Sequence, residues 1–219
     1  MQVVHEARRR GRQRRAVGRD PAEEQQGRFC ANMGGLNRNK DLNNMARILI
    51  VFSSTDGHTE KICTQLKRVI EQNAHQATVV AIQNVQQAGL ETFDKLIVGA
   101  SIRYGKHSKL IFDFIERNLP LLERKSNAFF SVNIVDRKPE KNQPETNPYM
   151  RKFLKQTTWQ PKNLAVFAGK LDYPKYGFFD RLMIRFIMLI THGPTDPATV
   201  VEFTDWGKVE AFGQLVSDM

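Results

Sequence analysis

The chain has 219 residues, 41% of them hydrophobic, which is enough to bury one core of ordinary domain size. Its two cysteines, Cys30 and Cys63, exclude a disulfide framework and a cysteine-based metal cluster, so we expect a reducing compartment and no metal site. No stretch reaches the roughly 18 to 20 apolar residues that span a bilayer, and no apolar segment follows the basic N-terminus. We therefore expect a protein without a signal peptide that is soluble or peripheral to a membrane.

The formal net charge of +10 is shared between two parts of the chain, because residues 1–45 carry +5 and the remaining residues another +5. Residues 1–44 include the run Arg8 to Arg15, lack a helical or strand period, and are predicted to be disordered. No aromatic or folded reader accompanies these arginines, so we expect no nucleic-acid partner. Met45 is a natural start directly before the first strand, which leaves open whether residues 1–44 are native. The basic remainder favours an anionic substrate or an anionic membrane surface.

The first predicted strand, Ile48 to Phe52, is a continuous apolar run, typical of central parallel strands that are buried on both faces. Ser53 to Thr59 then supplies hydroxyl groups and Gly57 before an apolar stripe at helical spacing begins. Hydroxyls, a tight turn and the unpaired amides of a helix N-terminus together favour binding of a phosphate group. An ordinary Ser/Thr-rich turn that caps the helix is the alternative.

The segment Ser101 to Gly105 follows the third predicted strand, 95–100, which comes after a second strand at 77–82. In an open parallel sheet, ligands bind beyond the carboxyl ends of the strands, where the strand order reverses. Arg103 could hold a carboxylate there, and Tyr104 could stack on a planar ligand. A surface arginine and a packing tyrosine are the alternatives.

A polar, basic loop with two prolines, 136–144, separates later elements, and a loop of this length in a compact domain is more often functional than idle. Just before it, Asn133 and Val135 stand where amide and backbone groups would meet a ligand, although Asn133 could equally close a turn. The elements around the loop are predicted from the same periodicities: a helix from about Leu110 to Pro120, a strand at 128–135, a helix from Tyr149 to Leu154 and a strand at 164–168.

In residues 170–193 the alternation of strands and helices is interrupted, and this segment is predicted to be an amphipathic insertion. Phe178 to Ile190 is predicted to be a helix of roughly 20 Å, too short for a hydrocarbon core of about 30 Å. Its wide apolar arc, flanked by arginines, suits the interface of an anionic membrane, and packing on the domain or a homodimer contact is the alternative. Thr199 to Phe203 is predicted to resume the fifth strand, and Asp205 to cap a last helix. Residues 45–219 thus form one three-layer α/β domain.

The segment from Ile50 to Thr59 resembles the signature of the flavodoxins: an aliphatic pair, an aromatic, a hydroxyl at Ser54, the small Gly57 and then Thr59. Cys63 departs mildly from the small alanine common there, because a buried thiol behaves as a small hydrophobe. The resemblance implies a flavodoxin-like five-stranded parallel sheet of order 2-1-3-4-5, of the long-chain type with an insertion in the last strand, and FMN as the cofactor. The residues implied to surround FMN are Ser53, Ser54, Thr55, Asp56, Gly57, His58, Thr59, Ser101, Ile102, Arg103, Tyr104, Gly105, Ser131, Val132, Asn133 and Val135.

Further segments, GASIRYG (99–105), SVNIVDRKPEK (131–141), YPKY (173–176), FFDRLMI (178–184) and TDW (204–206), resemble the flavodoxin-like, quinone-dependent protoporphyrinogen oxidases of bacterial haem biosynthesis. The resemblance runs from about Met45 to the C-terminus. It implies oxidation of protoporphyrinogen IX, menaquinone or ubiquinone as electron acceptor, and a peripheral location on the cytoplasmic face of the inner membrane. Candidate contacts for the substrate's propionates, by charge pairing, are Arg103, Arg137, Lys138 and Lys141. Tyr104 is a further substrate-binding candidate.

No side chain stands out as a general base, so solvent is expected to take the protons. The rival interpretations are an NAD(P)H-dependent flavodoxin-like quinone reductase, an electron carrier without a substrate site, and a cofactor-free interaction module at the membrane. The basic charge and the insertion disfavour the carrier.

Overall fold

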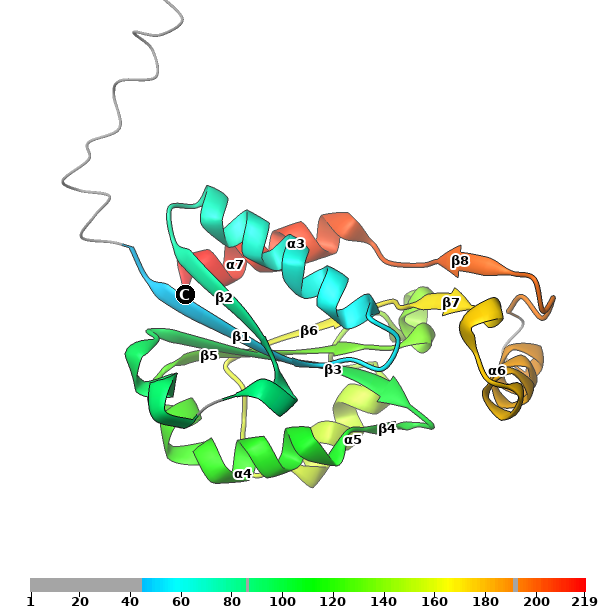
Figure 1. Cartoon of the computed structure of the whole chain (residues 1–219), viewed down its shortest axis with the longest axis horizontal. Helices are drawn as coiled ribbons and strands as arrows, with labels where there is room; N and C mark the ends of the chain where they lie inside the picture. The colour runs from blue at the N-terminus through cyan, green and yellow to red at the C-terminus, as the bar shows by residue number, and fades with distance from the viewer. Residues whose placement is uncertain (1–44, 86, 191–192) are drawn as a thin grey trace, which may run out of the picture. The chain divides into compact units, whose positions relative to one another are not determined.

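The computed structural model describes residues 45–85, 87–190 and 193–219, so the predictions for residues 1–44 lie outside the described residues. The main sheet has five parallel strands (Figure 1), which lie side by side in the order β2 (Gln76–Ala81), β1 (Arg47–Ser53), β3 (Lys95–Arg103), β5 (Ser126–Val132) and β6 (Asn163–Phe167). Ile50 of β1 pairs with Val79 on one side and Ile97 on the other. The predicted order 2-1-3-4-5 is therefore confirmed, with the strand order reversing between β1 and β3.

Two hydrophobic cores lie on the two faces of this sheet. Along β1, Leu49 and Val51 face one core, while Ile48, Ile50 and Phe52 face the other. This alternation explains why the strand reads as an unbroken apolar run. The first core is closed by α4 (Lys109–Arg124) and α5 (Pro148–Gln156), and the second by α3 (His58–Gln72) and α7 (Trp206–Asp218). The predicted three-layer sandwich is confirmed.

Two predicted boundaries are wrong. Helix α4 does not end near Pro120 but continues to Arg124, because Leu121 and Leu122 are buried in the first core and their burial outweighs the hydrogen bond that the proline cannot make. The strand predicted to reach Val135 ends at Val132. There the side chain of Asn133 accepts a hydrogen bond from the Asp136 amide and starts a short 3₁₀ turn, as the alternative interpretation of Asn133 anticipated.

A short strand that the sequence did not indicate, β4 (Lys106–His107), folds back antiparallel on the end of β3. The two residues between them, Tyr104 and Gly105, have φ values of 50° and 74°. Positive φ at both positions is what a two-residue type I′ hairpin turn requires. Glycine adopts this conformation freely, but for Tyr104 it is uncommon and strained.

The insertion does not split the fifth strand as predicted. After β6 the chain forms β7 (Lys170–Asp172), then α6 (Phe178–Ile190), and returns as β8 (Val200–Glu202), which pairs with β7 in a separate two-stranded antiparallel sheet (Figure 1). Val200 and Glu202 are exposed and only Val201 is half-buried, so β8 lacks the burial of a strand of the main sheet. The predicted bounds of α6 and the Asp205 cap of α7 are confirmed.

Short 3₁₀ segments complete the description at Ile82–Asn84, Gln87–Thr92, Ile134–Arg137, Pro139–Lys141 and Tyr173–Lys175. None of the helices in the described ranges combines the length and apolar character that crossing a membrane would need.

Candidate cofactor and substrate site

A cavity of about 460 Å³ lies at the carboxyl ends of β1, β3 and β5, where open parallel sheets bind ligands. The loops that follow these three strands form three of its walls, and the insertion forms the fourth. The residues that line it are Ser54, Thr55, Asp56, Gly57, His58, Thr59, Lys61, Ser101, Ile102, Arg103, Tyr104, Gly105, Val132, Asn133, Ile134, Val135, Arg137, Tyr149, Gly169, Lys170, Leu171, Asp172, Lys175, Tyr176, Met183, Ile184, Ile187, Met188 and Glu202.

The loop after β1 offers hydrogen-bond donors that suit an anion. The Gly57 amide donates to Ser54 Oγ at 3.0 Å, which curls the loop, and Gly57 has a φ of 80° where α3 begins. The hydroxyl of Thr59 is buried, at 1% exposure of the residue, and has no hydrogen-bond partner. A buried hydroxyl without a partner is costly unless a ligand satisfies it. Together with the free amides of the first helical turn, this loop fits the phosphate of FMN.

His58 links this loop to the chain that follows β8. Its Nε2 lies 2.6 Å from Thr204 Oγ1, and the Thr204 hydroxyl donates to the Ala168 carbonyl at 2.8 Å. Since that hydroxyl has only one hydrogen, His58 Nε2 must be the donor to Thr204. Burial lowers the pKa of His58, with Glu202 opposing and Lys61 adding to the shift. A neutral His58 therefore ties the start of α3 to Thr204, in the segment between β8 and α7.

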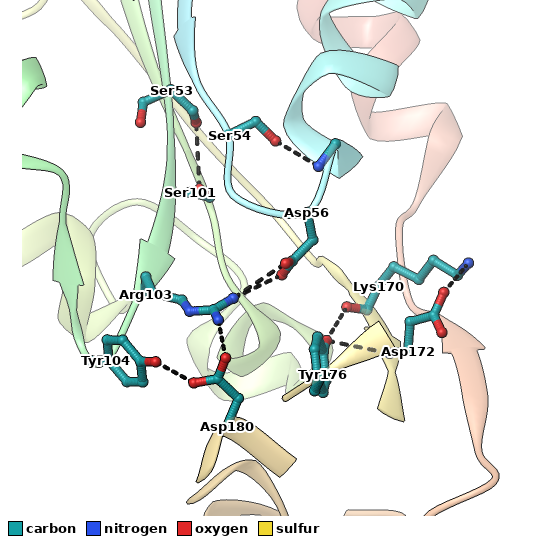
Figure 2. A network of polar contacts seen from close by, with 11 residues as sticks. Ser53, Ser54, Asp56, Ser101, Arg103, Tyr104, Lys170, Asp172, Tyr176 and Asp180 are labelled. Atoms are coloured by element: carbon teal, nitrogen blue, oxygen red, sulfur yellow. Dashed lines mark hydrogen bonds and ion pairs between the residues drawn. The ribbon is translucent and has the colours of Figure 1, made fainter. Parts of the chain in front are cut away.

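The hairpin after β3 contributes a charged cluster (Figure 2). Arg103 Nη1 donates to both carboxylate oxygens of Asp56 at 3.2 Å, while Nη2 donates to Asp180 at the start of α6. The Tyr104 hydroxyl donates to the other oxygen of Asp180. Burial by itself would lower the pKa of Arg103, but the contact with Tyr104 and the two carboxylates outweigh it and raise the pKa. The Arg103 guanidinium thus connects the loop after β1 to the insertion.

The segment that follows β5 forms one wall of the cavity, and a buried polar network behind it holds this segment in place. Ser131 Oγ lies 3.0 Å from His107 Nε2 and 3.5 Å from the Asn133 side-chain amide. The Asn147 amide donates to Asn133 Oδ1 at 3.2 Å, and the same Oδ1 accepts from the Asp136 backbone amide. These bonds orient residues 133–135, whose backbone borders the cavity. Next to them Arg137 donates to the Ile134 carbonyl at 3.0 Å, and burial lowers its pKa.

The fourth wall is apolar and comes from the insertion. Met183, Ile184 and Ile187 of α6 line the cavity, and Met188 is fully buried in a small core of the insertion with Leu171, Tyr173 and Tyr176. The Tyr176 hydroxyl accepts from the Asp172 amide at 3.2 Å, and burial raises its pKa. The cavity therefore has a polar end at the loop after β1 and an apolar end at α6.

Most of the predicted site residues meet in this cavity, but four of them do not line it. Ser53 is buried within β1, where its carbonyl accepts from Ser101 Oγ at 3.4 Å, and Ser131 lies behind the wall. Lys138 and Lys141 sit beyond the cavity, in a turn closed by the bond from the Lys141 amide to the Lys138 carbonyl at 2.9 Å. Neither lysine is part of the cavity lining, and a contact of Lys138 or Lys141 with the substrate stays a prediction.

Sequence reasoning missed the insertion's share of the wall, notably Asp172, Tyr176 and the cavity-facing side of α6. The YPKY segment contained a signal for Tyr176, but the spacing of an apolar helix does not reveal which side faces a cavity.

The family model of the flavodoxin domain matches residues 49–198. The chain therefore belongs to the flavodoxin family. Two relatives show to which enzymes within this family the chain is similar. Protoporphyrinogen IX dehydrogenase (quinone) of Escherichia coli strain K12 is 39% identical over 173 residues, covering 79% of this chain and 96% of that protein. The protein of the same name from Leishmania major is 41% identical over 167 residues, covering 76% of this chain and 72% of that one. The chain belongs to the same enzyme family as these two dehydrogenases, so the resemblance predicted from its motifs is confirmed.

Solved flavodoxin structures also align with the chain. A flavodoxin from the domain Archaea has a TM-score of 0.47 at 15% identity, covering 78% of this chain and 96% of that one. Flavodoxin 1 from Bacillus cereus has a TM-score of 0.46 at 17% identity, covering 79% of this chain and 98% of that one.

Proposed function

We propose that this protein binds FMN and oxidises protoporphyrinogen IX to protoporphyrin IX in haem biosynthesis, passing the electrons to menaquinone or ubiquinone. The observation that carries the proposal is one cavity that has a phosphate-type loop at one end, the apolar side of α6 at the other, and Arg103 and Arg137 in its lining. The names of the relatives at 39% and 41% identity support the choice of donor and acceptor. The functional unit in this proposal is residues 45–219, which contain every residue of the cavity wall.

In this proposal, the residues from Ser54 to Thr59 hold the FMN phosphate through amide and hydroxyl donors. The wall segments at 101–105 and 133–135 border the flavin ring. When bound, FMN would supply the hydride acceptor that the side chains lack, taking electrons from the porphyrinogen two at a time and passing them on to the quinone. Since no side chain of the cavity is evidently placed as a general base, the protons pass to solvent.

The substrate has an apolar macrocycle and two propionate groups, and the cavity offers matching chemistry. Met183, Ile184 and Ile187 present an apolar surface for the macrocycle or the quinone tail. Arg103 and Arg137 present guanidinium groups of the kind that pairs with carboxylates.

The proposal includes peripheral association with the cytoplasmic face of the inner membrane through α6. Its outward side carries Phe178, Phe179, Leu182, Phe186, Leu189 and Ile190, each at least 60% exposed. An aromatic and aliphatic face of this extent, next to Arg181 and Arg185, has the composition of helices that lie in a lipid interface. A homodimer contact is the competing use of the same face. In this proposal one helix serves both the lipid surface, through its outward side, and the cavity wall, through Met183, Ile184 and Ile187.

The test is anaerobic turnover of protoporphyrinogen IX by the FMN-loaded protein with and without a soluble menaquinone or ubiquinone analogue. We expect the quinone to raise the rate of porphyrin formation at least tenfold. A rate that does not respond to quinone would refute the proposal. Rapid reduction of the bound flavin by NADPH would favour a quinone reductase instead, and a protein that takes up no flavin would rule out both enzymes.

A further inference from the structure

The contacts of Asp180 resemble those of a bound ligand rather than those of a surface ion pair. Asp180 is the acidic residue of the first turn of α6, and both of its carboxylate oxygens are engaged by one neighbouring hairpin. Arg103 Nη2 binds one oxygen and the Tyr104 hydroxyl binds the other (Figure 2). A guanidinium and a phenol that hold the two oxygens of one carboxylate form a complete receptor for that group.

This receptor, Arg103 and Tyr104, faces the cavity. Both residues line its wall, whereas Asp180 reaches the receptor from the helix. The side chains of Arg103 and Asp180 are 28% and 17% exposed, so the pair is only partly shielded from water. An ion pair in such a position contributes little net free energy, and a competing carboxylate can replace it.

The receptor is also built at a conformational cost. Tyr104 occupies the turn position of the β3–β4 hairpin with a φ of 50°, where asparagine or glycine would be relaxed. Strain of this kind persists where the surrounding structure holds it, and it concentrates at ligand-binding positions. Lys152 Nζ supports the turn by donating to the Gly105 carbonyl at 3.2 Å.

The rest of α6 is anchored independently of Asp180. Met188 packs in the insertion's own core, the Arg181 guanidinium donates to the Tyr176 carbonyl at 3.2 Å, and Arg185 donates to the Thr195 carbonyl at 2.9 Å. Release of Asp180 would therefore free the first turn of the helix from the hairpin without dissolving the insertion.

We propose that Arg103 and Tyr104 form a carboxylate-binding subsite for the substrate, and that Asp180 occupies it as an internal competitor until a substrate carboxylate displaces it. The inference rests on the proposed function, since it is a propionate of the tetrapyrrole that takes the place of Asp180. Asp180 then weakens the binding of ligands that carry a free carboxylate, because only these compete with it for the subsite.

The test compares the binding of protoporphyrin IX and its dimethyl ester to the FMN-loaded full chain, by quenching of flavin or porphyrin fluorescence. Asp180→Asn should bind the diacid about fivefold more tightly, the factor expected when a competing ion pair worth roughly 1 kcal/mol is removed, and should bind the ester unchanged. Tyr104→Phe, which keeps the ring and loses the donor, should weaken the diacid alone. Glu123→Gln, an exposed residue of α4, is the matched control and should change neither.

Hydrogen exchange of residues 178–182 provides a second readout. It should quicken in Asp180→Asn, and in the wild type on addition of the diacid but not of the ester. An unchanged or weaker diacid affinity in Asp180→Asn, or equal changes for diacid and ester, would overturn the inference. Failure of the proposed function looks different: protoporphyrinogen would not be oxidised, while the preference for diacid over ester and its response to Asp180→Asn would remain.

Discussion

The buried hydroxyl of Thr59 has no hydrogen-bond partner unless a ligand supplies one. The residue is buried at the start of α3 and lines the cavity together with residues 54–58. An unsatisfied buried hydroxyl lowers the stability of the ligand-free chain, and a phosphate oxygen that accepts its hydrogen recovers that free energy on binding. Thr59 therefore couples folding stability to cofactor affinity.

We expect Thr59→Val to weaken FMN binding roughly tenfold to a hundredfold, because a hydrogen bond to a charged group is worth about 1.5 to 3 kcal/mol. The FMN-free variant should be at least as stable as the wild type, since valine has the same shape and lacks the unsatisfied hydroxyl. A flavin fluorescence titration measures the affinity, and urea unfolding without FMN measures the stability.

Thr64→Val is the matched control on the same helix. Thr64 is exposed, and its hydroxyl already donates to the Glu60 carbonyl at 3.0 Å, so its replacement should leave the FMN affinity unchanged. An unaltered affinity in Thr59→Val, or the same loss in both variants, would refute the role given to Thr59.

At the residue scale, the sequence located the cavity but not the pairing within it. Arg103 and Tyr104 were predictable because they directly follow a buried strand, and the carboxyl ends of parallel strands meet at one edge. The contact between Arg103 and Asp180 spans 77 positions, and nothing local in either segment indicates it. Lys138 and Lys141 show the converse: their charge suggested a role in substrate binding, but they lie at short 3₁₀ segments outside the cavity lining, so that role stays a prediction.

Helix α6 is the element whose two apolar sides need separate explanations. One side lines the cavity and the other is exposed, with Phe179 at 82% and Phe186 at 62%. Neither of these two phenylalanines lines the cavity, so they can be changed without altering its wall.

We expect Phe179→Glu combined with Phe186→Glu to lower binding to vesicles of anionic lipid at least tenfold in co-sedimentation, because each variant side chain forfeits about 1.5 to 3 kcal/mol of apolar burial and adds a repelled charge. FMN affinity should not change. Leu110→Glu combined with Leu215→Glu is the control, since these residues are 42% and 43% exposed on α4 and α7. Equal vesicle binding by all three proteins would contradict the membrane assignment, and loss of a dimer in the α6 variant alone would assign the face to self-association.

At the element scale, the elements themselves were predictable and their partners less so. The bounds of α6 followed from its apolar run and the last helix from its Asp205 cap, both local signals. The pairing of β8 with β7 did not follow from a local signal. Its three residues have moderate apolar character, which suits a separate two-stranded sheet as well as a continuation of the fifth strand of the main sheet. The predicted end of α4 at Pro120 was wrong for a related reason. The helical hydrogen bond that the proline cannot make is outweighed by the burial of Leu121 and Leu122, which only the tertiary structure reveals.

For the whole molecule, two buried titratable groups link stability to pH with opposite signs. Burial lowers the pKa of His107 to about 4, and the ring lies against Phe129 and Phe153. Burial raises the pKa of Asp136 to about 6, and its Oδ1 has no hydrogen-bond partner. Neither side chain lines the cavity, so both act on folding rather than on ligand binding.

The signs follow from which state binds the proton. Between about pH 4 and 6.5 the unfolded chain protonates His107 and the folded chain does not, so the stability due to neutral His107 is present above pH 6.5 and is lost as the pH falls. Asp136 keeps its proton up to about pH 6 in the folded chain and only to 3.8 in the unfolded chain. Its contribution therefore falls as the pH rises from 3.8 through 6, and the two effects oppose each other over the same range.

Replacing one group at a time should therefore reveal how each of them changes the slope of the unfolding free energy against pH, because in the wild type the two effects cancel in part. In Asp136→Asn the remaining histidine should make the free energy of unfolding rise more steeply with pH between 4 and 6, by up to about 1.4 kcal/mol per pH unit relative to the wild type. In His107→Gln, which can keep a hydrogen bond to Ser131, the free energy should rise less steeply than in the wild type by a similar amount. Urea unfolding of the FMN-free chain at half-unit pH steps measures these slopes, and the differences between variants cancel the exposed carboxylates common to all. Parallel curves for the three proteins would mean that neither buried group titrates differently in the folded and unfolded chains.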